Sequence, residues 1–269
     1  MRDVRLDDLA AILTIAIAVL TGVVLLVFSL PSIPYVHLSI IWDPVSRFFG
    51  ILAFVFGTLY VSLLALLISS PIGIGAALYI VRYAPDKVKR YYSMIVEAMA
   101  SVPSVVYGLR GFLVLGSFFG AFKANKLVAS LTLSVMLLPT IISLSRASLE
   151  SVPREIVEAA YALGAMKHEA ALVALGYSRN QILGSVLIAL MRAVGETMAV
   201  TMTVGNVVGV SMNPLDPGST LTSLIATEFG GAMDPIHRSA IIFAAFLLFV
   251  ISLTIYSIAR RVIGRGEEK

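Results

Sequence analysis

With 269 residues, of which 58% are hydrophobic and 13% charged, the chain is far too apolar for a soluble domain and indicates a protein embedded in lipid. It has no cysteine, which excludes disulfides, thiolate metal sites and cysteine nucleophiles, and its three scattered histidines argue against zinc. We therefore expect no catalytic residue, no metal and no cofactor. The net charge of +4 is distributed over segment ends, so no nucleic-acid partner is indicated.

Six apolar runs are long enough to cross a bilayer, which takes roughly 20 residues in a helix. These runs are residues 9–30, 48–81, 93–116, 127–144, 181–207 and 239–259. The first lacks a signal-peptide cleavage pattern and is expected to be retained. The second is too long for one straight crossing, so part of it should lie at the surface or bend near Pro71, although one crossing is the simpler assignment. The sequence thus predicts an all-α polytopic membrane protein with about six transmembrane helices.

Lysine and arginine fall mainly on one side of these runs, which predicts the orientation because basic residues accumulate in cytoplasmic loops. The residues assigned to the cytoplasmic side are Arg2, Arg5, Arg82, Lys87, Lys89, Arg90, Arg146, Arg154, Lys167, Arg179, Arg260, Arg261, Arg265 and Lys269. Those assigned to the opposite side are Arg47, Lys123, Lys126 and Arg238. We expect a multi-pass protein of the cytoplasmic (inner) membrane with both termini in the cytoplasm.

The domain organisation follows from these spans. Residues 1–48 should form an N-terminal transmembrane helix and an outward loop, residues 49–260 the core domain, and residues 261–269 a cytoplasmic tail. Within the core, residues 145–179 are too regular for a linker and predict two short helices. Pro153 suits a first helical turn, Gly164 permits a break, and a second helix should begin near Met166. Ser178 and Gln181 resemble a capping box for the next span. The alternative is a surface hairpin that only joins two spans.

The fifth run carries a polar stripe. Arg192, Glu196, Ala199, Thr203 and Asn206 recur at helical spacing and would share one face of an unbroken helix. A charge at mid-bilayer costs roughly 2.5 to 3.5 kcal/mol, so the two charged residues should pair, face the bundle interior or line water. An arginine fork matches the oxygens of an oxyanion, which makes this face a candidate solute path. The alternative is a buried ion pair that holds helices together.

Other polar residues inside the spans are weaker candidates. Arg110 would add a second positive charge to the path or reach out of the membrane as a structural residue. Ser101 and Ser104 either line the path or accompany a kink at Pro103. Glu97 is interpreted as an interfacial carboxylate. In the last outward segment, turn signals surround a short helix expected at residues 220–229, with Ser219 as its cap.

Several segments carry a resemblance to a known family. Glu158, Ala159 and Ala160, followed by Gly164, resemble the start of the EAA loop of ABC importer permeases, although Gly176 stands where that loop ends in proline. Residues 103–108, 192–202 and 221–229 resemble the phosphate-specific branch, and the second of these is more similar to its PstC-type members than to PstA. The chain departs from the branch at Arg110, where the family carries an aromatic residue.

The resemblance implies a type I ABC importer permease fold with a cytoplasmic two-helix coupling loop. It implies import of inorganic phosphate by alternating access, with Glu158, Ala159, Ala160 and Gly164 in contact with an ATPase subunit. The implied partners are a related PstA-like permease, two PstB-like ATP-binding subunits, an extracytoplasmic PstS-like phosphate-binding protein that contacts the last outward loop, and membrane lipid.

Energy must come from another subunit, since Gly73-Ile74-Gly75 lacks the lysine and Ser/Thr of a nucleotide-binding loop, and we expect no enzyme activity in this chain. Sulfate or molybdate remain alternative solutes, because an arginine binds them as well. Two alternatives belong to other classes. One is an integral membrane enzyme, for which Glu196, Glu97 and His168 would be the acid or base candidates. The other is a regulatory membrane scaffold.

Overall fold

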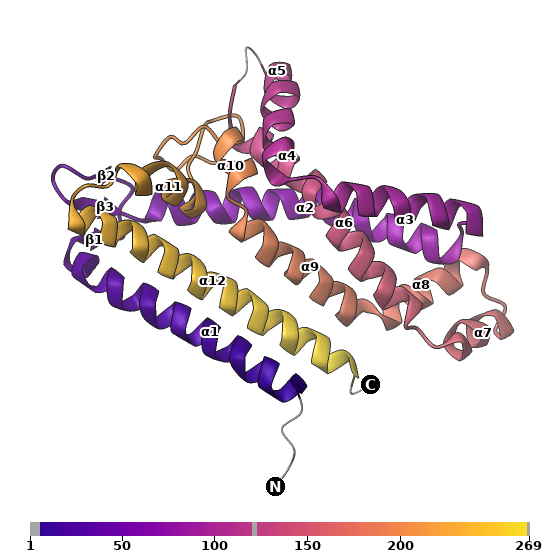
Figure 1. The fold of residues 1–269 in the computed structure, drawn as a ribbon. Coiled ribbons are helices and arrows are strands. Elements are labelled where there is room, and N and C mark those ends of the chain that lie inside the picture. Colours follow the sequence, from indigo (N-terminus) through magenta and orange to yellow (C-terminus); the bar gives the residue numbers. More distant parts are fainter. Residues whose placement is uncertain (1–5, 120–122, 268–269) are drawn as a thin grey trace, which may run out of the picture.

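The computed structural model describes residues 6–119 and 123–267, with side chains from residue 10 to residue 264. Arg2, Arg5, Lys269 and the side chain of Arg265, which were used above for orientation, lie outside this part. The described chain is a bundle of long helices with short helices at both ends (Figure 1). The start of α1, the end of α12 and the two short helices α7 and α8 all lie toward the same end of the bundle.

Four helices of the described chain are long and apolar enough to cross a membrane: α1 (Leu6–Ser29), α2 (Leu52–Arg82), α6 (Lys126–Glu150) and α12 (Pro235–Glu267). They confirm four of the six expected spans. Helix α2 runs through Pro71 as one element, which confirms the single crossing. Helix α12 continues through residues expected to be a tail.

The third expected span is not one straight helix. Helix α3 (Asp86–Ser101) and helix α4 (Ser104–Arg110) meet at 90°, so the expectation of an unbroken helix over residues 93–116 was wrong. Pro103 explains the break, because proline lacks an N–H and pushes the preceding residue out of the helical region. Val102 is accordingly extended. A π-helical turn, η2 (Gly111–Leu115), and a last turn, α5 (Gly116–Phe118), complete this arm.

The fifth expected span is also divided, between α9 (Arg179–Gly195) and α10 (Met198–Thr203). Glu196 between them is extended, with ψ 122°. The face that Arg192 and Thr203 would share on an unbroken helix therefore does not exist. Figure 1 shows α10 displaced from the line of α9 toward α4 and α11.

The connections contain small elements. After α1 come the 3₁₀ helix η1 (Leu30–Tyr35) and a three-stranded sheet of β1 (Val36–His37), β2 (Trp42–Asp43) and β3 (Phe48–Gly50), in the order β1-β3-β2. Strand β1 is parallel to β3 and β2 is antiparallel to it, so that Phe49 faces Val36 on one side and Trp42 on the other. This sheet was not predicted from the sequence, because its strands are only two or three residues long.

The two short helices expected within residues 145–179 are confirmed as α7 (Arg154–Ala162) and α8 (Lys167–Tyr177). The capping box expected at Ser178 was wrong. Its hydroxyl donates to the Ala174 carbonyl oxygen at 2.9 Å, because α8 passes into α9 through this single residue.

The short helix expected in the last loop is also confirmed, as α11 (Leu221–Glu228), followed by η3 (Phe229–Gly231). The expected cap was wrong by one residue. Thr220, not Ser219, caps α11, since the Thr220 hydroxyl accepts the Ser223 N–H at 3.1 Å. The hydroxyl of Ser219 instead lies 3.2 Å from that of Ser223.

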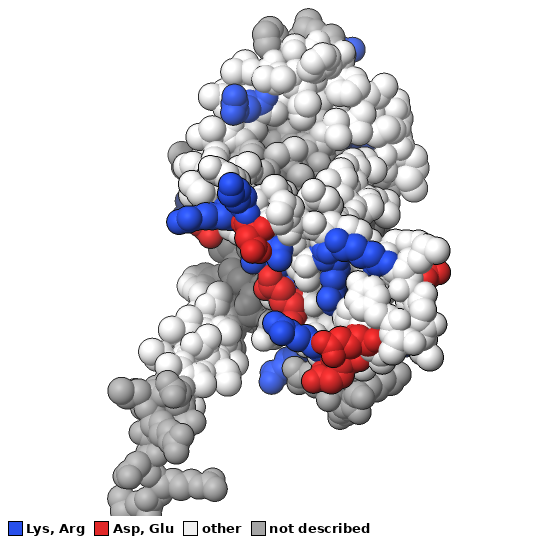
Figure 2. All heavy atoms as spheres, turned by 90° about the vertical axis from the view of Figure 1, so that its right-hand side faces the viewer, with Lys and Arg blue, Asp and Glu red and all other residues white. Residues whose placement is uncertain are grey.

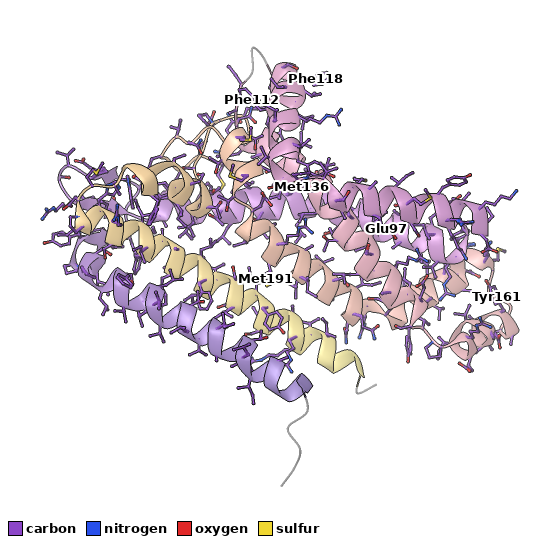
Figure 3. The ribbon with its side chains drawn as sticks, viewed as in Figure 1. Glu97, Phe112, Phe118, Met136, Tyr161 and Met191 are labelled. Atoms are coloured by element: carbon purple, nitrogen blue, oxygen red, sulfur yellow. The ribbon has the colours of Figure 1, made fainter. Side chains whose placement is uncertain are left out.

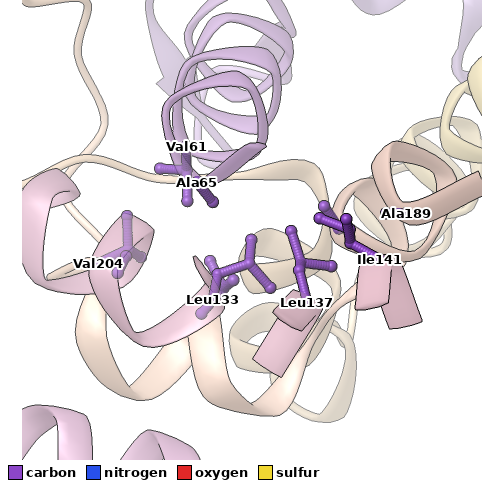
Figure 4. Packing of buried hydrophobic residues seen from close by; sticks show 10 residues of the cluster. Val61, Ala65, Leu133, Leu137, Ile141, Ala189 and Val204 are labelled. Carbon is purple, nitrogen blue, oxygen red and sulfur yellow. The ribbon is translucent and has the colours of Figure 1, made fainter. Parts of the chain in front are cut away.

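The largest hydrophobic core lies where α2, α6, α9 and α10 meet (Figure 4). Its fully enclosed residues are Val61, Ala65, Ala129, Leu133, Leu137, Ile141, Ala189, Ala193, Val200 and Val204. By contrast, α1 packs alongside α12, and none of its most apolar window is buried. Such an apolar surface belongs in lipid.

Candidate functional site

The two helix breaks belong to elements that pack directly on each other. Helix α4 crosses α10 so closely that a Cβ on Gly108 would lie 2.9 Å from the Ala199 Cα atom. Across the α3–α4 bend, the Tyr107 hydroxyl of α4 donates to the Met99 carbonyl oxygen of α3 at 2.8 Å and so links the two helices. The α4–α10 crossing is therefore a junction of two interrupted spans, a place where backbone and polar groups can face a solute rather than lipid.

Arg192 lies in the last turn of α9, next to this junction, and its side chain is exposed. Its Nη1 atom donates to the Thr140 hydroxyl on α6 at 3.0 Å. Among the described residues the guanidinium has no carboxylate partner, so pairing with Glu196, one of the three alternatives considered above, does not occur. Most of its donors remain free for another acceptor.

Glu196 forms hydrogen bonds that stabilise the break between α9 and α10. Its Oε1 atom accepts the Ala199 N–H at 3.3 Å, and its backbone oxygen accepts the Thr222 hydroxyl of α11 at 3.0 Å. The carboxylate thus lies at the start of α10, where a negative charge is favourable. Because of the helix break, Glu196 does not share a helical face with Arg192, as it would on a continuous helix.

The other two polar residues of the predicted stripe donate hydrogen bonds to backbone carbonyl oxygens of α10. Thr203 is fully buried, and its hydroxyl donates to the Ala199 carbonyl oxygen at 2.6 Å. Asn206 has a left-handed backbone, with φ 53°, and its Nδ2 atom donates to the Thr201 carbonyl oxygen at 2.9 Å. The Thr203 hydroxyl is therefore closed off inside the bundle, whereas Asn206 is exposed just beyond the end of α10.

Arg110, Ser101 and Ser104 lie on the other interrupted span. Arg110 is exposed and lines a cleft of about 310 Å³ between α4, η2 and α6, together with Tyr107 and Thr132. Ser101 is exposed and its hydroxyl donates to the Ala98 carbonyl oxygen at 2.8 Å, whereas Ser104 is half-buried at the start of α4. Beyond them the arm leaves the bundle, and Phe118 stands clear of it (Figure 3).

At the opposite end of the bundle, α7 and α8 form a hairpin with its own small core of Val152, Val157, Ala160, Ala170 and Ala174. Ala160 lies in this core, while Glu158 and Ala159 are exposed. Gly164 makes the turn with φ +86°, a conformation that favours glycine. Figure 2 shows lysine, arginine and acidic side chains gathered on this end of the molecule.

The contacts of two further residues, Lys126 and Glu228, were not predicted from the sequence. Lys126, counted above as an outward charge, is only 2% exposed, and its Nζ atom donates to the Ser211 carbonyl oxygen at 2.7 Å. Glu228 accepts both the Trp42 indole N–H at 2.8 Å and a hydrogen bond with His237 at 2.9 Å. For Lys126 a signal existed: it opens an apolar run, where an unpartnered lysine would be unfavourable.

The comparisons with known proteins agree with this architecture. Residues 69–266 match the family described as "Binding-protein-dependent transport system inner membrane component". The chain belongs to this family. The permease is 34% identical over 253 residues to the phosphate transport system permease protein PstC of Mesorhizobium japonicum, covering 85% of this chain and 77% of the relative. It is 31% identical to PstC 2 of Mycobacterium bovis over 98% of this chain and 92% of that one.

Solved structures show the same fold for the permease. A chain of the MetNI methionine ABC transporter in an inward-facing conformation superimposes with a TM-score of 0.60 at 21% identity, over 78% of this chain and 94% of that one. A chain of an amino acid ABC transporter gives a TM-score of 0.59 at 19% identity. The type I ABC importer permease fold is therefore confirmed, and the protein is a multi-pass membrane component of a transporter.

Proposed function

We propose that this permease moves inorganic phosphate across the cytoplasmic membrane as the PstC-type subunit of an ABC importer. The observation that carries the proposal is Arg192, an arginine without a carboxylate partner among the described residues, exposed beside the junction of two interrupted spans. The relatives named as phosphate transport permeases over most of the chain supply the choice of solute.

The chemistry suits a passing anion. The guanidinium of Arg192 offers several donors in one plane, and only one bond, to Thr140, occupies them. In a water-poor path a phosphate oxygen would gain a charge-assisted hydrogen bond there. Arg110, on the neighbouring interrupted span, is the second candidate contact, with Ser101 and Ser104 beside the α3–α4 bend.

Thr203 and Asn206 have a different role in this proposal. Their polar atoms are bonded to backbone carbonyls of α10, so we assign them to holding α10 in place. Glu196 acts in the same way through Ala199 and Thr222. Its charge would then set the shape of the break, and through it the position of the Arg192 guanidinium.

The partners follow from the two ends of the bundle. We propose that the exposed side of the α7–α8 hairpin, with Glu158, Ala159 and Gly164, contacts a PstB-like ATPase, which would place both termini in the cytoplasm. A PstA-like second permease, a second ATPase copy and a PstS-like phosphate-binding protein at the last outward loop would complete the importer. ATP hydrolysis then belongs to the partner subunits and not to this chain.

Rival functions receive less support. An enzyme would need its acid and base groups together, but Glu97 lines a cleft between α3 and α6, Glu196 lies between α9 and α10, and His168 lies on α8. Among the described residues no group of three potential metal ligands occurs either. Sulfate and molybdate remain competitors as solutes, because a guanidinium recognises any tetrahedral oxyanion.

The test is phosphate uptake by the purified importer in proteoliposomes, with sulfate and molybdate as competitors. Arg192→Ala should lower phosphate flux at least tenfold, because the anion would cross a low-dielectric path without its charge partner. Arg90→Ala, an exposed arginine on α3, is the matched control and should transport normally. Assembly and basal ATP hydrolysis should remain near normal in both variants. Normal uptake by a well-assembled Arg192→Ala importer would reject the site, and inhibition by sulfate as strong as by phosphate would reject the solute.

A further inference from the structure

A cleft of about 320 Å³ opens between the first and last spans, at the end of the bundle that carries the small sheet. It is lined by Phe28 and Pro31 from the α1 side and by Ile236, Ser239 and Ile242 from α12, with Arg238 among its lining residues. Neither helix contributes to the α4–α10 junction, so this cleft is separate from the proposed solute path.

The walls of the cleft are apolar. Its hydroxyl group, on Ser239, is already used, since it donates to the Phe28 carbonyl oxygen at 2.7 Å and joins the two helices. Met233, beside the cleft, is 89% exposed. An apolar cleft of this kind holds water poorly and favours a hydrocarbon occupant.

Arg238 gives the cleft one charged group. Its guanidinium lies 5.8 Å from the centre of the Phe229 ring and is exposed. Within the described residues it has no ion pair, and the carboxylate one turn earlier, Asp234, is bonded to Arg47 at 3.1 Å. The positive charge is therefore available to an external anion.

The position of the cleft identifies that anion. In the sequence, the charge-free apolar run of α12 begins directly after Arg238, and that of α1 ends just before Pro31, so Arg238 is expected near the edge of the hydrocarbon layer. Lipid phosphates occupy this depth, while acyl chains occupy the depth of Ile242. The exposed apolar surface of α1 suits contact with lipid, and Phe28 near its end lines the cleft.

We propose that this cleft binds one anionic phospholipid, with an acyl chain between α1 and α12 and its phosphate on Arg238. The charge pattern selects the headgroup: with Asp234 engaged by Arg47, no carboxylate lining the cleft can accept a lipid ammonium. A phosphatidylglycerol-type headgroup therefore fits better than a zwitterionic one. The site would anchor the α1–α12 pair to one leaflet.

The experiment is native mass spectrometry of the purified permease complex after exchange into phosphatidylglycerol or phosphatidylcholine with identical acyl chains. The wild type should retain phosphatidylglycerol preferentially. Arg238→Gln should lower this retention about fivefold, as expected for one basic residue at a membrane surface, whereas Arg238→Lys should keep it. Lys123→Gln, another exposed basic residue predicted on the same side, is the matched control and should retain lipid like the wild type. Ile242→Trp, which fills the cleft without changing charge, should also lower retention.

Several outcomes would overturn the proposal. Equal retention of both lipids, or unchanged retention in Arg238→Gln, would remove the headgroup contact. Displacement of the lipid by millimolar inorganic phosphate would indicate a free-anion site instead. A complex without bound lipid would mean that another protein surface covers the cleft. If Arg238→Gln fails to assemble, Arg238→Lys and Ile242→Trp decide the question. None of these results depends on phosphate transport.

Discussion

Two connections between spans are built in opposite ways. The segment from Gly205 to Ser219, on the side of the small sheet, has little regular structure but is tied to the bundle by buried polar contacts. The α7–α8 hairpin at the other end has regular helices, but it packs largely on itself. Regular secondary structure and rigid attachment are therefore separate properties.

The first connection is fixed at several points. The N–H groups of Lys126 and Leu127, which open α6, donate to the carbonyl oxygens of Asp216 and Pro214 at 3.2 and 2.8 Å. The loop thus supplies acceptors that the helix lacks at its start. The Lys126 ammonium also lies 5.3 Å from the centre of the Tyr60 ring of α2, so one side chain joins the loop to two helices.

The second connection exposes its contacts instead. Leu163 is 89% exposed and Met166 67% exposed at the turn of the hairpin. Apolar side chains at such a position suit a surface that another protein covers. We therefore expect changes in the first connection to lower the stability of the permease, and changes in the second to affect coupling.

The largest effect is expected at the closest contact of the first connection. A Cβ on Gly57 of α2 would lie 2.0 Å from the Ser219 carbonyl oxygen, and backbone cannot yield easily there. Gly57→Ala should lower the free energy of unfolding by about 3 kcal/mol, the upper range for overpacking. Thermal unfolding in detergent measures this. Gly75→Ala, on the same helix with open space around the new methyl group, should leave the melting temperature unchanged or slightly higher. Equal melting temperatures for the two variants would contradict the close attachment.

A smaller effect is expected at Lys126. Lys126→Met should lower stability by about 2 kcal/mol, because the Ser211 carbonyl loses its donor and Tyr60 its cation. Because the chain has no cysteine, a single Ser219→Cys can report on loosening of the loop. Ser219 is buried, so a maleimide should react slowly with this cysteine in the parent and faster with Lys126→Met. Lys123→Met is the control. Unchanged labelling would show that the backbone contacts alone hold the loop.

The smallest stability effect is expected in the hairpin. Gly164→Ala places a methyl group at φ +86° and should cost about 1 kcal/mol locally, with little change in global unfolding. If the hairpin contacts an ATPase as proposed, phosphate-stimulated ATP hydrolysis should fall while membrane insertion stays normal. Gly176→Ala, in α8 with free space around it, should hydrolyse ATP like the parent. Full stimulation in Gly164→Ala would argue against a transmission role for this turn.

The long apolar helices, the two short helices around Gly164 and the short helix after Thr220 could be predicted from the sequence alone. These features depend on neighbours in the chain: hydropathy over a window, a proline or glycine at a helix end, a hydroxyl at a cap. The permease family was indicated by a resemblance, carried by the motif around Glu158 and by residues 103–108, 192–202 and 221–229, and the comparisons confirm it. The cap predicted at Ser219 was wrong by one residue, since Thr220 is the N-cap of α11.

The positions of the breaks within spans and the pairing of charged residues depend instead on tertiary packing. The hydropathy of residues 181–207 permits a continuous helix, but α10 instead packs against Gly108 of α4, a contact between residues far apart in the chain. That break separates Glu196 from Arg192 and leaves the arginine beside Thr140. Trp42 and Glu228, 186 positions apart, likewise meet only in the folded chain. A window of sequence records the preference of each segment for lipid or water, whereas such contacts depend on the packing of distant segments.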